Sequence, residues 1–202
     1  MRALRGLYRG LEAVNGADSG IDPVAFLVPF TPRGAGDELV LVRESESGVE
    51  IALALAEPAL AHLEHSSNLL GDAALAHTLP VIEGLSHLLY LVEAVRRERP
   101  VSALELETQA DVDKLALCLL ARWPAHRHDF PHLVDRLLCQ WSPLPNQTPP
   151  ERERYSTANR IALAFVRRLA RLVDAGQLAN LRRLLRRFWS ADMPGKLALA
   201  GA

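Results

Sequence analysis

Hydrophobic residues recur every three or four positions through the first fifteen residues of the chain. This spacing places them on one face of an amphipathic helix. Gly16 follows where a helix commonly ends in a left-handed residue. We therefore predict a helix over residues 1–15, with this buried face: Leu4, Leu7, Tyr8, Leu11 and Val14.

The next apolar segments are short and rich in β-branched residues, which favours strands. Three are predicted, over Val24–Phe30, Glu38–Arg43 and Val49–Leu55. The segment ESESG at 44–48 has the composition of a hairpin loop. These three segments predict a small antiparallel β-meander with one buried face, and a helix must cover that face. We expect the N-terminal helix to do so, because it is nearest in sequence.

Beyond Glu57 the apolar spacing becomes helical. Pro80–Trp123 is the central feature, two long helices that meet near Arg99-Pro100. Ser102-x-x-Glu105 has the pattern of a capping box and starts the second helix near Ala103. Further helices are predicted over Pro58–His65, Phe130–Trp141, residues 151–175 and residues 177–189.

These elements predict an α+β fold, in which a small N-terminal meander with one helix precedes a predominantly α-helical bundle. We expect a subdomain at residues 1–56, a bundle at 57–192 packed against it, and a loose tail at 193–202. The whole is expected to form one integrated domain.

Composition adds the broad class. Hydrophobic residues make up 49% of the chain and charged residues 23%, which is typical of a globular protein. No uninterrupted apolar run approaches the roughly 20 residues of a membrane span. Arginines interrupt the N-terminus, so it does not resemble a secretory signal. Cys118 and Cys139 lie in apolar helical segments and are expected to be reduced residues of the core. A cytoplasmic protein without a transmembrane segment is therefore expected.

The central helical pair contains a candidate polar site. His87 and Asp113 each lie about 13 positions from the turn, so an antiparallel pair of helices would place them opposite each other. Asp113 falls on an otherwise apolar stripe, where a carboxylate is costly unless it is paired. Glu83 lies one turn from His87, and Lys114 adjoins Asp113. Candidate catalytic residues are therefore Glu83, His87, Asp113 and Lys114.

Two interpretations of this cluster remain open. A histidine oriented by an aspartate, with a glutamate nearby, is the arrangement of general acid–base or metal chemistry. Alternatively, His87 and Asp113 form a buried pair that only fixes the helix register. Glu83, His87 and Asp113 would provide too few ligands for a metal, so no metal or cofactor is expected. Glu105, Glu107 and Asp111 are interpreted as a solvated acidic face near a helix N-terminus.

A second group of histidines precedes the predicted helix at residue 130. His126, His128, Asp129 and His132 differ from the His-x-His-x-Asp-His pattern of binuclear zinc hydrolases, because Asp129 directly follows His128. Asp129 as the N-cap of the helix would explain its position without a metal. Whether His126, His128 and His132 bind a metal is left open by the sequence.

Charge is distributed unevenly although the net charge is only −1. Residues 1–100 contain 8 Lys/Arg against 14 Asp/Glu, and residues 101–202 contain 15 against 10. Residues 160–190 contain eight arginines and a single acid, Asp174. Like charges one helical turn apart are destabilising unless an anion offsets them. Arginines 182, 183, 186 and 187 form such pairs, so an anionic partner is expected for Arg160, Arg167, Arg171, Arg182, Arg183, Arg186 and Arg187.

No phosphate-binding loop, dinucleotide-binding motif or serine-hydrolase motif is present. The leading hypothesis is therefore a non-enzymatic interaction or accessory protein that binds a protein partner or a second copy. One alternative is a ligand-binding protein or enzyme that uses Glu83, His87 and Asp113 with Arg160. A further alternative is nucleic-acid binding through the arginine-rich C-terminal helices.

Overall fold

The computed structural model describes residues 1–30, 38–45, 48–123, 125–140 and 147–201. The fold is α+β and predominantly helical, as the sequence predicts. Contacts divide the chain into two compact units. Unit 1 contains residues 1–12 and 17–101, and unit 2 contains residues 13–16 and 102–202. The division therefore falls at residue 101, between the two long helices.

The sheet belongs to unit 1 and has three strands, β1 (Leu27–Val28), β2 (Glu38–Ser45) and β3 (Gly48–Leu55). Strands β2 and β3 form the predicted antiparallel hairpin, with Val40 opposite Leu53. However, β1 pairs with β3, and the pairing is parallel, so the order is β1-β3-β2. The prediction of a simple antiparallel meander is wrong in this detail. A short 3₁₀ helix, Pro23–Phe26, replaces the beginning of the first predicted strand.

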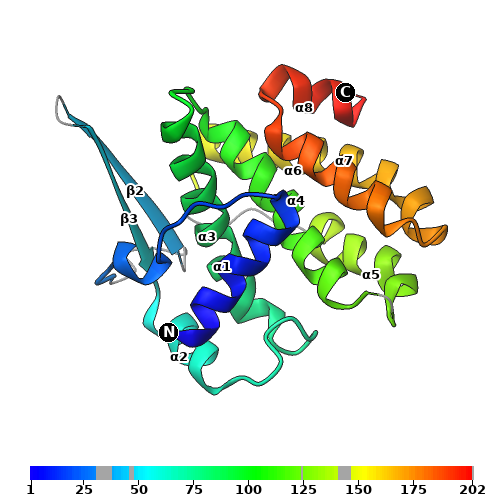
Figure 1. Cartoon of the computed structure of the whole chain (residues 1–202), viewed down its shortest axis with the longest axis horizontal. Helices are drawn as coiled ribbons and strands as arrows, with labels where there is room; N and C mark the ends of the chain where they lie inside the picture. The colour runs from blue at the N-terminus through cyan, green and yellow to red at the C-terminus, as the bar shows by residue number, and fades with distance from the viewer. Residues whose placement is uncertain (31–37, 46–47, 124, 141–146, 202) are drawn as a thin grey trace. The chain divides into compact units, whose positions relative to one another are not determined.

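Helix α3 (Leu75–Arg96) covers the sheet, by packing against both β2 and β3 (Figure 1). The expectation that the N-terminal helix would do so is wrong. The close approach depends on Gly84, since a Cβ atom there would lie 2.8 Å from Cδ1 of Leu53. Leu53 and Leu55 on β3 are buried and form the core of this contact.

The other helices of unit 1 begin close to their predicted positions. Helix α1 (Arg2–Asn15) buries the predicted apolar face and ends before Gly16, whose φ is 67°. Helix α2 (Glu57–His65) has Pro58 in its first turn, where the missing N–H costs nothing. Helix α3 starts at Leu75, five residues earlier than predicted, with Pro80 inside it. By length and composition alone, α3 is apolar enough to cross a membrane, with a mean hydropathy of 1.3 over an 18-residue window. However, 61% of that window is buried, as in the core helix of a folded unit.

Unit 2 is helical and is built around α6 (Pro149–Asp174), which packs against α4 (Ala103–Ala121), α5 (Phe130–Val134), α7 (Leu178–Ser190) and α8 (Met193–Ala200). A π-helical segment, Asp135–Cys139, continues α5. Figure 1 shows α7 beside α6, and α8 packs against both of these helices. The rings of Phe165 and Phe188 stack with centroids 4.0 Å apart and join α6 to α7.

Helix starts in unit 2 follow capping rules. The backbone N–H of Glu105 donates to Oγ of Ser102, 3.2 Å away, which confirms the start of α4 at Ala103. The carboxylate of Glu151 accepts hydrogen bonds from the N–H and the hydroxyl of Thr148, at 2.7 and 2.8 Å. These bonds lower the pKa of Glu151. Residues 141–146, which precede this cap, lie outside the described residues.

The C-terminal segment departs from the sequence-based expectation. Residues 193–200 form helix α8, whereas we expected a loose tail. Asp192 caps this helix by accepting a hydrogen bond from the N–H of Gly195, 2.9 Å away. The sequence contained the signal, because aspartate followed by Pro194 is a common helix start.

Candidate functional site

Helix α7 presents an unusual polar face. Its apolar residues Leu181, Leu185 and Phe188 are buried, so the helix turns its opposite side outward. That side consists largely of exposed arginines one helical turn apart, here called the arginine face: Arg182, Arg183, Arg186 and Arg187. In the described part of the chain, none of these guanidinium groups forms an ion pair with a carboxylate.

Two members of the arginine face make contacts with neutral groups. Arg186 donates to the backbone carbonyl of Ala13, 3.3 Å away, and its side chain lies against Gly16. Arg183 donates to Oδ1 of Asn180, one turn earlier on the helix. Arg186 thus satisfies a carbonyl at the end of α1. Its role is partly structural, while Arg182 and Arg187 have no such contact among the described residues.

Helix α6 adds further exposed arginines to unit 2. Arg160 donates to the hydroxyl of Thr157, 2.9 Å away, on its own helix. Arg167, Arg168 and Arg171 are also exposed, and within the described ranges they form no ion pair with an acid. The positive charge of residues 160–190 therefore remains available to an anionic partner.

The candidate catalytic residues are divided between the units. Glu83 and His87 lie on α3 in unit 1, whereas Asp113 and Lys114 lie on α4 in unit 2. A contact between His87 and Asp113 therefore stays a prediction. Lys114 forms an ion pair with Asp111, at 2.9 Å, within α4.

Within unit 2, Asp113 belongs to a buried polar network. Its side chain is fully buried, and its Oδ1 accepts hydrogen bonds from the amides of Asn15 and Gln109, at 3.0 and 2.9 Å. The sequence correctly required polar partners for this carboxylate. The sequence pattern did not identify Asn15, which lies 98 positions from Asp113. The position of Gln109, one helical turn before Asp113, was a local signal that could have identified it.

Lys196 extends the network from α8. Its ammonium group is fully buried and donates to Oε1 of Gln109 at 2.6 Å and to the carbonyl of Phe188 at 2.7 Å. It also lies 4.4 Å from the centre of the Phe188 ring, within cation–π range. Gln109 thus connects the cation of Lys196 to the carboxylate of Asp113. The sequence analysis missed Lys196 because it assigned this segment to a loose tail.

The predicted acidic face on α4 is not solvated. Glu105 and Glu107 are 3% and 8% exposed. Glu107 lies 3.8 Å from Nε of Arg154 on α6. The interpretation of these residues as a solvated surface is wrong, because α6 packs along α4 and brings Arg154 to Glu107. Cys139 is also misplaced by the sequence analysis, since it is exposed, whereas Cys118 is buried.

Unit 1 contains a second buried network, around Tyr8. The Tyr8 hydroxyl donates to Oγ of Ser19 at 3.0 Å, and the Ser19 hydroxyl donates to Glu12 at 2.6 Å. Arg96 donates to the backbone carbonyls of Asp18 and Ser19. Burial raises the pKa of Tyr8 to about 12. These bonds fix the loop after α1 and leave the phenol without a charged form at neutral pH.

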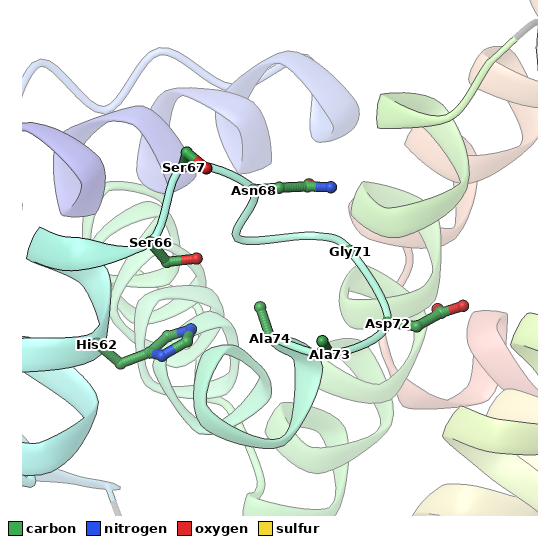
Figure 2. A pocket seen from close by; sticks show the side chains of 8 residues that line it. All are labelled: His62, Ser66, Ser67, Asn68, Gly71, Asp72, Ala73 and Ala74. Atoms are coloured by element: carbon green, nitrogen blue, oxygen red, sulfur yellow. The ribbon is translucent and has the colours of Figure 1, made fainter.

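A cavity of about 330 Å³ opens beside the loop after α2 (Figure 2). Figure 2 shows the His62 ring and the Ser66 hydroxyl pointing into it, while the Asp72 carboxylate points away. The His62 ring stacks against His77, with centroids 4.9 Å apart. Asp72 therefore does not orient His62, and the cavity lacks the arrangement of a Ser-His-Asp triad. Its lining combines polar and small apolar residues: His62, Ser66, Ser67, Asn68, Gly71, Asp72, Ala73 and Ala74.

The histidine group before α5 is brought together in part. His126, His128 and Asp129 each offer a ligand atom, and these atoms lie within 4.8 Å of one another. The exposed His132 is on α5 and is not a member of this group.

Comparison with known proteins adds no family to these observations. No protein-family model matches the chain, and comparisons with curated proteins and with solved structures also found no match.

Proposed function

We propose that this protein is a non-enzymatic interaction protein that binds an acidic protein partner through the arginine face of α7. The observation that carries the proposal is the set of four exposed arginines on one helix without a carboxylate partner in the described part of the chain. The cytoplasmic location expected from the sequence belongs to the same proposal.

The arginine face is destabilising to the isolated chain. Each pair of like charges at i and i+4, Arg182 with Arg186 and Arg183 with Arg187, costs a helix about 0.2–0.5 kcal/mol. Carboxylates of a partner would offset this repulsion and accept bidentate hydrogen bonds from the planar guanidinium groups. Arginine is also a residue type that is enriched where binding energy is concentrated in protein interfaces.

An acidic protein fits the charge of this chain better than nucleic acid does. Nucleic-acid-binding domains are generally strongly basic as a whole, and this chain has a net charge of −1. A protein partner with a local acidic patch needs only the arginine face itself.

Fluorescence anisotropy with labelled poly-L-glutamate as the probe tests the proposal. We expect saturable binding to the full chain that weakens as salt increases, because exposed charges are screened. The variant Arg182→Gln/Arg183→Gln/Arg187→Gln should bind at least about fivefold more weakly, from roughly 0.3–1 kcal/mol for each arginine. Arg186 is left in place because it contacts the Ala13 carbonyl.

A matched control removes three exposed positive charges elsewhere, with Arg2→Gln/Arg9→Gln/Arg97→Gln, and should bind as wild type does. Equal weakening in both triple variants would show a response to net charge and would contradict a binding face on α7. A single-stranded oligonucleotide that binds more tightly than poly-L-glutamate, and loses binding only in the α7 variant, would replace the acidic protein with nucleic acid.

A further inference from the structure

The turn before α5 directs three potential ligands toward one another. Nδ1 of His126 lies 3.7 Å from one carboxylate oxygen of Asp129, and Nε2 of His128 lies 3.4 Å from the other. The three ligand atoms lie within 4.8 Å of one another. The short 3₁₀ helix Arg127–Asp129 contributes to this arrangement, because its three residues per turn align side chains at i and i+3, here His126 and Asp129.

The expected capping role does not explain the position of Asp129. Asp129 occupies the N-cap position of α5, but its side chain makes no capping hydrogen bond. Its φ and ψ, −78° and 0°, differ from the extended conformation of a side-chain cap. The carboxylate faces the two imidazole rings instead. Helix capping therefore does not account for the position of Asp129.

The distances suit a tetrahedral metal ion. Two ligands each about 2.0–2.1 Å from zinc lie roughly 3.3–3.4 Å apart in a tetrahedron. The two nitrogen–oxygen distances, 3.7 and 3.4 Å, are close to this value. The three ligand atoms as a group span up to 4.8 Å, so these exposed side chains would move closer together on binding a metal. Arg127 is the nearest cation in sequence, and its guanidinium group lies against Gly176 at the end of α6.

We propose that Nδ1 of His126, Nε2 of His128 and the carboxylate of Asp129 bind one divalent transition-metal ion of the zinc class. The side chains of His126 and His128 are 62% and 73% exposed, so water completes the coordination. Two imidazoles select zinc, nickel or copper over magnesium and calcium, which prefer oxygen ligands. This site is independent of the arginine face and of the function proposed for it.

Isothermal titration of the full chain with zinc chloride tests the site. We expect one zinc ion per chain at neutral pH and no heat of binding with magnesium chloride. His126→Ala, His128→Ala and Asp129→Asn should each weaken zinc binding at least about tenfold, as the loss of a ligand costs no less than the loss of a supporting residue. His132→Ala removes an exposed histidine outside the group and should leave the affinity unchanged.

A spectroscopic measurement distinguishes coordination at this site from binding elsewhere. Cobalt(II) added to wild type should give visible absorption bands of a low-coordinate site, which the His126→Ala/His128→Ala variant should lose. No zinc binding by wild type would show that the cluster is only a set of contacts between the histidines and Asp129. Zinc binding that persists in the double variant would place the metal on other residues, and either result overturns the proposal.

Discussion

Lys196 and Asp113 carry opposite charges in the interior of unit 2 and are connected through the side-chain amide of Gln109. Burying a charge is costly unless hydrogen bonds and an opposite charge compensate it. The amide provides both bonds, because its NH₂ group donates to Asp113 and its oxygen accepts from Lys196. The network therefore fixes the position of α8 relative to α4 within unit 2.

We predict that Lys196→Met destabilises the protein by about 2–4 kcal/mol. The substitution removes the positive charge from the buried network and takes one donor each from Oε1 of Gln109 and from the Phe188 carbonyl. Urea denaturation followed by circular dichroism measures the change. Arg182→Met, which removes an exposed charge from α7, is the control and should change the free energy of unfolding by less than about 0.5 kcal/mol.

A double-mutant cycle sharpens this test. Lys196→Met combined with Asp113→Asn should cost less than the sum of the two single changes, with a coupling of about 1–3 kcal/mol. Strictly additive effects would contradict a network that connects the two charges through Gln109.

Tyr8 gives unit 1 a characteristic response to alkaline pH. Its pKa is raised to about 12 by burial, above the value near 10 of an exposed tyrosine. The folded state thus holds the phenol proton more tightly than the unfolded state does. This contribution to stability is fully present below pH 10 and is lost as the pH rises from about 10 to about 12.

We predict that wild type loses about 2 kcal/mol more stability than Tyr8→Phe over this pH range. Tyr8→Phe loses the hydrogen bond to Ser19, so at neutral pH it should be less stable by about 1 kcal/mol. Urea denaturation at neutral and alkaline pH measures both differences. Parallel pH profiles for the two proteins would falsify the assignment of this titration to Tyr8.

At the scale of elements, glycine residues in two helices serve different purposes. Gly84 on α3 lies against the sheet, where an added Cβ would be 2.8 Å from Leu53 and 3.4 Å from Leu55. Gly6 on α1 has nothing within 4 Å of an added Cβ. Only Gly84 is thus required for the contact between a helix and the sheet.

We predict that Gly84→Val destabilises the protein by about 1–3 kcal/mol, because Leu53 is fully buried and cannot move without strain. Gly6→Ala is the matched change in an open position and should stabilise by about 0.5–1 kcal/mol through helix propensity. Thermal unfolding of both variants measures these effects. A stabilising Gly84→Val would show that α3 does not approach the sheet this closely.

Several elements could be predicted from local patterns because their causes are local. The apolar spacing of α1, the cap at Ser102 and the glycine after α6 each depend on residues within a few positions. The parallel pairing of β1 with β3 joins Leu27 to Leu53, which are distant in the sequence, and no local pattern encodes it. The choice of α3 over α1 to cover the sheet depends on the small size of Gly84, which sequence spacing alone does not reveal.

At the scale of the whole molecule, charge is segregated between the units. Residues 1–100 have a net charge of −6 and residues 101–202 a net charge of +5. The two units have the same net charges as these two halves of the sequence, because the residues that differ between the two divisions, 13–16 and Val101, are uncharged. A second copy of the chain thus carries acidic groups of the kind that the arginine face would bind.

We predict that the chain self-associates at low salt, with a sedimentation coefficient that falls between about 50 mM and about 500 mM sodium chloride. The α7 variant Arg182→Gln/Arg183→Gln/Arg187→Gln should sediment as a monomer at both salt concentrations. A salt-independent coefficient would exclude a second copy as the acidic partner and leave another acidic protein in that role.

The sequence by itself determined the fold class, most helices, the hairpin and the arginine face, because these follow from spacing, caps and charge along a short stretch of chain. It also determined that Asp113 needed polar partners. Gln109 is a local partner, one helical turn from Asp113. Tertiary structure decided that Asn15 reaches Asp113 and that Lys196 reaches Gln109, since these contacts form only when distant segments pack together. It likewise decided that Glu105 and Glu107 are buried and that Asp129 faces two histidines, because burial and side-chain direction depend on neighbours that local sequence does not specify.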